Sequence, residues 1–175
     1  DCKTLKPIYN NKGVIKIEKK ELDIIMHLRR NGRESITNIS RETKLPISTI
    51  YERLKKNKFR AIKKTVTLID FAKLGFNCVV KVAMKVKKED RSLLKDHLMT
   101  HPNLNNLYKI NNGFDFLVEC VFNHVKEVEE FLDTLDSRFN ILEKKVYYVI
   151  EELVKENFLS DPIHRDIIYH EKKLF

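Results

Sequence analysis

The side chains best suited to chemistry lie between positions 48 and 64, where short polar and long basic residues surround two apolar ones. Ile50 and Leu54 are four residues apart, so they would dock one face of a helix and leave the opposite face in solvent. Polar side chains on such a face can hydrogen-bond base edges in the major groove of DNA, while ammonium groups neutralise phosphates. A basic helix that binds another protein is the alternative. The residues expected to contact DNA are Ser48, Thr49, Tyr51, Glu52, Arg53, Lys55, Lys56, Arg60, Lys63 and Lys64.

The basic residues are concentrated in the first third of the chain. The 175 residues carry a net charge of +9. Residues 18–64 hold 14 Lys and Arg against 6 acidic residues, whereas residues 65–157 hold 13 against 15. This asymmetry favours one module that meets a polyanion beside a second module that does not. A lysine-rich surface that serves only solubility is the alternative.

The sequence offers little support for catalysis. The 6 His residues show no paired metal-ligand spacing, and with 4 Gly there is no Gly-rich phosphate loop. The 3 Cys residues include no close pair, which favours a reducing, cytoplasmic location over a disulfide framework. No apolar run approaches the roughly 18 residues of a membrane span. We therefore expect no catalytic residue, metal, cofactor or membrane contact, and we expect Cys78 and Cys120 to be buried thiols.

Hydrophobic periodicity predicts three helices and a hairpin in the first 69 residues. Helices are expected over 18–30, 36–43 and 48–57. Ser35 and Ser48 are candidate N-caps, and Gly32 is expected to end the first helix in a left-handed conformation. Residues 59–69 mix basic and β-branched side chains without a helical period, as a small hairpin, or wing, would.

The pattern after Gly75 predicts the order strand, helix, strand, strand, helix, strand. Strands are expected over 77–87, 104–111, 114–122 and 141–151, and helices over 89–101 and 124–137. Asn112–Gly113 is a strong hairpin signal, because both residues tolerate a positive φ. This order is the split, ferredoxin-like motif, in which two helices cover one face of an antiparallel sheet. The predicted fold class is α+β: an N-terminal winged helix-turn-helix and a C-terminal ferredoxin-like βαββαβ sandwich.

Several motifs, in this order and spacing, resemble the Lrp/AsnC (feast/famine) family of transcription regulators over about residues 18–152. They are Leu22-Asp23, Asn31-Gly32-Arg33, the run ISRETKLPISTIYERLKK at 39–56, Leu74-Gly75, and Gly113-Phe114-Asp115, which is similar to the family's Gly-x-Asp turn. The family usually has Gly at the position of Lys44 and a Ser cap at that of Pro46. Ser48, Thr49 and Arg53 match family positions that face DNA.

The resemblance implies a sequence-specific, DNA-binding transcription regulator that forms homodimers and, at a higher level, octamers. It also implies that an amino acid or other small effector binds around His101, Asn111, Gly113 and Asp115. A plainer interpretation of Gly113 and Asp115 is a tight turn followed by an outward-facing side chain. The implied divisions are an N-terminal extension (1–17), a winged helix-turn-helix DNA-binding domain (18–69), a linker (70–76), a ferredoxin-like regulatory, or RAM, domain (77–152) and a C-terminal tail (153–175).

Two other functions fit the same architecture. Sirohaem decarboxylases resemble this two-domain fold and bind a tetrapyrrole in the regulatory half. A module that senses an effector or binds a protein without contacting DNA is the second alternative. The scattered His residues and the basic N-terminal third favour the regulator over both.

Overall fold

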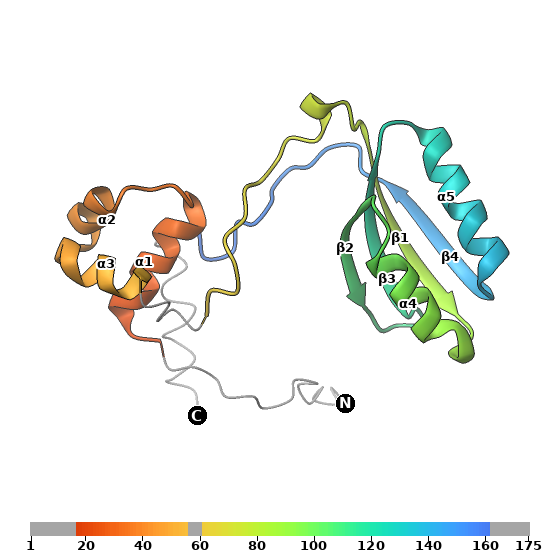
Figure 1. Cartoon of the computed structure of the whole chain (residues 1–175), viewed down its shortest axis with the longest axis horizontal. Helices are drawn as coiled ribbons and strands as arrows, with labels where there is room; N and C mark the ends of the chain where they lie inside the picture. Colours follow the sequence, from red (N-terminus) through yellow and green to blue (C-terminus); the bar gives the residue numbers. More distant parts are fainter. Residues whose placement is uncertain (1–16, 56–60, 162–175) are drawn as a thin grey trace, which may run out of the picture. The chain divides into compact units, whose positions relative to one another are not determined.

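The computed structural model describes residues 17–55 and 61–161. The chain divides into two compact units (Figure 1). We call the part that runs to Thr67 and resumes at Val154 the helical unit, and Leu68–Leu153 the sheet unit. The chain therefore passes from one unit to the other twice, and residues 154–161 belong with the helices rather than with the sheet that precedes them.

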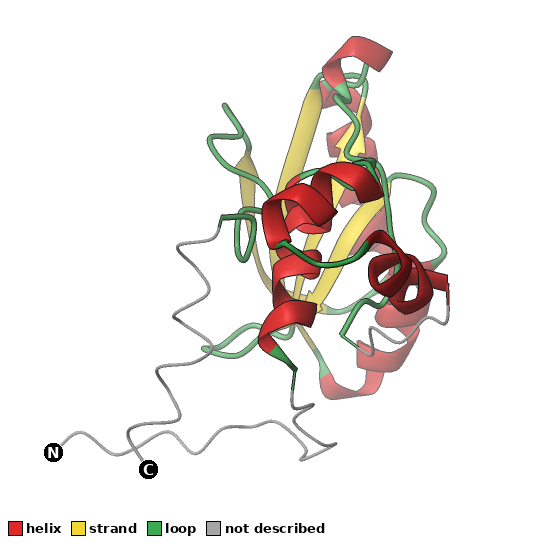
Figure 2. Cartoon of the chain, turned by 90° about the vertical axis from the view of Figure 1, so that its left-hand side faces the viewer, coloured by secondary structure: helices red, strands yellow, loops and turns green. Residues whose placement is uncertain are grey.

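The helical unit contains the three predicted helices, α1 (Lys19–Arg30), α2 (Ile36–Thr43) and α3 (Ile47–Lys55), drawn in red in Figure 2. Helices of 8 to 12 residues are marginal in isolation, so packing has to hold them. A small cluster of aliphatic side chains does this, and each of its buried members is at most 6% exposed: Ile24, Ile39, Leu45 and Ile50.

The predicted end of α1 is wrong in its detail. The helix ends at Arg30 on an extended Asn31, whose backbone N–H donates to the His27 carbonyl at 2.9 Å. The Asn31 side chain then accepts from the backbone N–H of Arg33 at 3.0 Å. Gly32 is not among the residues with positive φ, so the asparagine side chain, rather than glycine's conformational freedom, shapes this exit.

One predicted N-cap is confirmed and the other is wrong. The Ser35 hydroxyl accepts from the Asn38 backbone N–H at 3.1 Å and caps α2. Helix α3 begins one residue earlier than predicted, because the Pro46 carbonyl already accepts from Thr49 N–H at 3.0 Å. Ser48 therefore lies inside the first turn, where its side chain is exposed instead of capping the helix.

Lys44 ends α2 in the left-handed region, with φ 59° and ψ 25°. A residue with a Cβ pays roughly 1–2 kcal/mol there, a cost that Gly avoids. This conformation accounts for the Gly that the resembling family usually has at this position. The departure at Lys44 is thus a local strain in an otherwise ordinary turn between two helices.

The predicted wing is not formed by the residues that the structure describes. Residues 61–69 contain no strand, and residues 56–60 lie outside the described ranges. Ile62 packs against the core of the helical unit, whereas Val66 and Leu68 are 61% and 56% exposed. β-branched residues favour a strand only where a neighbouring strand supplies cross-strand contacts, and 61–69 pairs with none among the described strands.

The sheet unit has the predicted ferredoxin-like topology. Strands β1 (Cys78–Val86), β2 (Leu104–Lys109), β3 (Phe116–Phe122) and β4 (Ile141–Tyr148) form one antiparallel sheet in the order β2-β3-β1-β4. The unit also contains two α-helices, α4 (Arg91–Met99) and α5 (Val125–Arg138), and two short 3-10 helices, η1 (Ala72–Leu74) and η2 (Lys88–Asp90). No helix in the described part of the chain is long and apolar enough to span a bilayer.

One face of the sheet packs against α4 and α5. Val80, Val82 and Met84 alternate along β1 and are fully buried with Leu94 of α4 and Leu135 of α5. The alternation arises because successive strand residues point to opposite faces. Cys78 and Cys120 lie on this inner face as free, buried thiols, which confirms the interpretation from the sequence.

The turn between β2 and β3 is formed by Asn112 and Gly113, with φ angles of 60° and 90°. Both residues adopt the left-handed backbone conformation that their residue types predicted. Strand β3 begins at Phe116, two residues later than expected. The alternation of β3 would put Phe114 on the inner face with Phe116, but the Lys145 ammonium lies 5.2 Å from the centre of the Phe114 ring. The tight turn therefore ends the alternation before it reaches Phe114.

Candidate nucleic-acid interface and effector turn

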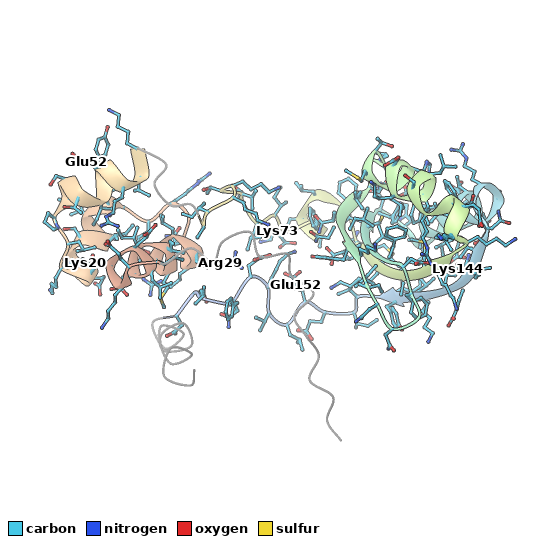
Figure 3. All side chains as sticks on the ribbon, turned by 90° about the horizontal axis from the view of Figure 1, so that it is seen from below. Lys20, Arg29, Glu52, Lys73, Lys144 and Glu152 are labelled. Atoms are coloured by element: carbon cyan, nitrogen blue, oxygen red, sulfur yellow. The ribbon has the colours of Figure 1, made fainter. Side chains whose placement is uncertain are left out.

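Helix α3 presents one polar face to solvent. Ser48, Tyr51, Glu52 and Lys55 are exposed and follow the three- and four-residue spacing of a single helix face. Ile50 is 0% exposed on the opposite side, and Figure 3 shows Glu52 projecting outward from the helix. The Lys55 ammonium lies 5.7 Å from the centre of the Tyr51 ring. This face therefore combines hydroxyl, carboxylate and ammonium groups, and the apolar side of the helix holds it against the core.

The structure places two expected DNA contacts at the margins of this face. Thr49 is half-buried. The side chain of Arg53 is 26% exposed, and its guanidinium lies 3.0 Å from Glu18 and 3.9 Å from Glu21. Glu18 immediately precedes α1 and Glu21 lies in its first turn, so Arg53 ties α3 to α1. Helix periodicity alone could not reveal this, because it does not show which residues of another helix lie alongside.

The other expected contacts follow α3 along the chain. Lys63 and Lys64 are exposed, immediately after Ile62 packs against the core of the helical unit. The backbone beside these two exposed lysines is therefore held in place by the packing of Ile62. Lys56 and Arg60 lie outside the described residues.

Asp115 is not the outward-facing turn residue that the plain interpretation expected. Its side chain is only 13% exposed. One carboxylate oxygen accepts from the backbone N–H of Val86 at 3.0 Å, and the other lies 2.9 Å from the Arg91 guanidinium. The pairing of β1 with β4 shifts register between Lys85 and Val86, so the carboxylate supports the backbone where the ladder is irregular.

The four residues implied for an effector site do not lie together in the single chain. Asn111 and Gly113 are exposed at the turn after β2, beside Asp115. His101 precedes β2, so the six residues of that strand, about 20 Å in length, separate it from the turn.

His101 is half-buried against an aromatic ring. Its ring packs 4.8 Å from that of Phe131, and its Nδ1 accepts from the Asn103 backbone N–H at 3.3 Å. Burial, reinforced by the neighbouring His97, lowers the pKa of His101 below its ordinary value. These contacts describe a neutral, packed histidine. Among residues 17–55 and 61–161, no group of three or more His, Cys, Asp or Glu side chains is arranged to hold a metal ion.

Comparison with known proteins identifies relatives along most of the chain. No protein-family model matches the sequence. The chain is 31% identical over 115 residues to the HTH-type transcriptional regulator FL11 of Pyrococcus horikoshii, which covers 65% of this chain and 76% of the relative. It is 27% identical over 122 residues to the HTH-type transcriptional regulator LrpC of Bacillus subtilis, covering 68% and 83%.

Solved structures share the fold. The structure of B. subtilis LrpC superposes with a TM-score of 0.70 at 23% identity and covers 81% of this chain and 99% of its own. The regulator NMB0573 of Neisseria meningitidis, solved with L-Met, gives 0.75 at 18% identity and covers 85% and 97%. At these identities the likeness establishes the α+β architecture of both units.

Proposed function

The chain belongs to the Lrp/AsnC family of transcription regulators, and we propose that its helical unit binds duplex DNA by inserting the exposed face of α3 into the major groove. The observation that carries this proposal is the face itself: Ser48, Tyr51, Glu52 and Lys55 lie opposite a fully buried Ile50. A recognition helix needs this combination, because its apolar side must stay docked while its polar side meets base edges.

The polar groups divide by the contacts that they can make. The Glu52 carboxylate can accept a hydrogen bond from the cytosine amino group, and the Ser48 hydroxyl can donate or accept. Lys55, Lys63 and Lys64 suit phosphates, where charge matters and base identity does not. Thr49 and Tyr51 belong to the same proposed surface, while Arg53 holds α3 against α1 beside it. Lys56 and Arg60 remain DNA contacts proposed from the sequence.

We further propose that the protein acts as a homodimer that pairs through the sheet face opposite α4 and α5. A two-fold dimer presents two α3 helices, so its half-sites would lie about one DNA turn, or 34 Å, apart. The octamer remains the proposed higher assembly, and a cytoplasmic location fits this function.

The turn at Asn111, Gly113 and Asp115 is the proposed effector site, with His101 as a separate, more distant participant. The NMB0573 structure contains L-Met, which supports an amino acid as the class of effector. The Asp115 carboxylate could accept a hydrogen bond from an effector's ammonium group, in addition to its contacts with the Val86 backbone N–H and the Arg91 guanidinium. A coupling free energy of about 1–3 kcal/mol between this site and DNA would be enough for regulation.

The rival functions differ in their direct tests. The named relatives are transcriptional regulators, which favours a regulator over a sirohaem-decarboxylase-like enzyme. A purified protein that binds a tetrapyrrole would support the enzyme. A protein that fails to shift any duplex at low salt would support the module that does not bind DNA.

Removing two phosphate-binding groups tests the proposed function. We expect Lys63→Ala/Lys64→Ala to weaken binding to all duplex sequences about equally. The slope of log affinity against log salt should fall by about two, since each lysine accounts for roughly one released counterion. Fluorescence anisotropy across a salt series measures both quantities.

Lys87→Ala/Lys88→Ala is the matched control, because it removes the same charge from two adjacent, exposed lysines of the sheet unit. It should leave the salt slope almost unchanged. Equal slopes for the two double variants would show that the polyanion does not bind at Lys63 and Lys64.

Arg53→Ala is expected to weaken binding to a preferred site by about 1–3 kcal/mol and to relax the sequence preference. The loss follows because α3 is no longer tied to Glu18 and Glu21 and its polar face loses its fixed orientation. Selection of bound sequences from a random duplex pool measures the preference.

Glu18→Gln separates the two possible roles of Arg53. If the arginine acts by positioning α3, this change reproduces part of the loss, whereas a direct base contact would leave Glu18→Gln with normal binding. Unchanged affinity and preference in Arg53→Ala would mean that α3 is not the recognition helix.

A further inference from the structure

A row of polar side chains crosses the sheet face opposite α4 and α5. Strand pairing places Glu119 of β3 directly beside Lys81 of β1, and Lys81 beside Tyr147 of β4. Asn106 of β2 pairs with Glu119 on its other side, next to the irregularity at Asn105. The row therefore runs across all four strands, from one edge of the sheet to the other. We call these five residues the polar row.

Glu119 is the centre of the polar row. Its side chain is 13% exposed, although α4 and α5 pack on the opposite face of the sheet. One carboxylate oxygen accepts from the side-chain amides of Asn105 and of Asn106, the latter at 2.8 Å, and the other lies 3.2 Å from the Lys81 ammonium. Burial alone would raise the pKa of Glu119, but these amides and Lys81 outweigh it and lower the pKa below its ordinary value. The carboxylate is therefore held ionised.

The rows on either side of the polar row are largely apolar. Val79 and Val121 pair on one side, and Ala83 and Leu117 pair on the other. Val121 and Ala83 are each 7% exposed. Tyr108 continues the second row on β2 and is 52% exposed, and Lys145 ends that row on β4. A second sheet could pack on such a surface, and the centre of the polar row would then lie between the Val79–Val121 pair and the Ala83–Leu117 pair.

The polar row matches a second copy of itself. A two-fold axis parallel to the strands and midway between β1 and β3 would place Lys81 of each copy opposite Glu119 of the other. These are the two central strands, so the axis also centres the two sheets on one another. A partner with apolar residues in this row would bury the Lys81–Glu119 pair without offering compensating charge, which is unfavourable.

We propose that Lys81 and Glu119 set the register and partner choice of the homodimer by forming reciprocal ion pairs between the two copies. This inference rests on the proposed pairing through the sheet face and names the residues that select the partner. The central ion pairs disfavour both a shifted register and a related chain with different residues in the row.

Charge reversal tests the proposal in the full-length protein. Lys81→Glu/Glu119→Lys keeps an ion pair within the chain, and the Asn amides can turn their oxygens toward the new lysine. Mixed with isotope-labelled wild-type chains, the variant should pair with itself. Mixed dimers, which would bring like charges together, should be about tenfold fewer than random exchange predicts. Native mass spectrometry counts the three dimers.

Lys126→Glu/Glu130→Lys is the matched control, because Lys126 and Glu130 form an exposed pair, 3.8 Å apart, on α5, which packs on the other face of the sheet. These chains should mix randomly with the wild type. Random mixing of the Lys81/Glu119 reversal would overturn the proposal. If the Lys81→Glu/Glu119→Lys variant does not fold, Glu119→Gln is the second test. We expect Glu119→Gln to raise the dimer dissociation constant about tenfold while the circular dichroism spectrum stays unchanged. An unchanged dissociation constant would contradict the proposal.

Dimer pairing and DNA binding are measured separately, so one proposal can fail without the other. A monomeric wild-type chain that binds DNA would overturn the role of the polar row and leave DNA recognition standing. A dimer with selective pairing that ignores DNA at low salt would do the reverse.

Discussion

Replacing Ile50 with alanine is expected to lower the free energy of unfolding of the helical unit by about 2–5 kcal/mol. Ile50 is 0% exposed and packs in one cluster with Ile24, Ile39 and Leu45. The change removes its contacts and leaves a cavity that short helices fill poorly. Since α3 has no other fully buried residue, its orientation should be lost as well, together with sequence-specific binding. Urea unfolding followed by helical circular dichroism measures the destabilisation.

Tyr51→Ala is the control for this experiment. Tyr51 is the next residue along α3 and is 51% exposed, so its removal should change the unfolding free energy by only about 0.5 kcal/mol or less. It should still alter DNA affinity, because Tyr51 lies on the exposed face. If Ile50→Ala unfolded at the same urea concentration as the wild type, the assigned core of the helical unit would be wrong.

Cys120 is expected to react with iodoacetamide at pH 8 about a thousandfold more slowly than an unperturbed thiol. Burial, with a smaller contribution from the Glu119 carboxylate, raises the pKa of Cys120 to about 12 from an ordinary 9.0. Only the thiolate is nucleophilic, and three pKa units lower its fraction about a thousandfold. The residue is also 0% exposed, which slows the reagent further. Peptide mass spectrometry of a time course gives the rate at this site.

The rate of the same reaction in 6 M guanidinium is the reference, because the chain is unfolded there and Cys120 is no longer buried. Raising the pH of the folded protein from 7 to 9 should increase the absolute rate while Cys120 remains mostly a thiol. Rapid native alkylation of Cys120 would show that β3 opens readily, and it would contradict the packed inner face that this residue shares with Val80 and Val118.

The elements of this protein were predictable because their signals are local. Three- and four-residue spacing marked α1, α2 and α3, and alternation marked β1 and β3, since each pattern follows from the geometry of its own element. The type of two adjacent residues was enough to place the left-handed turn at Asn112 and Gly113. Likewise, the apolar sides of β1 and β3 placed Cys78 and Cys120 in the core.

The features that sequence reasoning missed depend on residues distant in the chain. Arg53 lies on a polar part of α3, but its partners Glu18 and Glu21 are more than thirty positions earlier. Asp115 follows a turn, yet its carboxylate supports Val86 of another strand. The part of the predicted wing that the structure describes, residues 61–69, contains no strand, and no described strand pairs with it. In each case the deciding neighbour comes from packing, not from spacing.

Local chemistry in the chain thus established which segments are helical or extended, which faces are apolar, and where positive charge accumulates, because each depends on residues within a few positions. Folding established which polar side chains remain available for a partner. It turned Arg53 toward α1, enclosed Asp115, separated His101 from the turn at Gly113, and brought Lys81, Glu119 and two asparagines together on one sheet face. The physical reason is that a charged group takes its role from the oppositely charged or hydrogen-bonding groups within a few ångströms, and only the packed chain determines which groups those are.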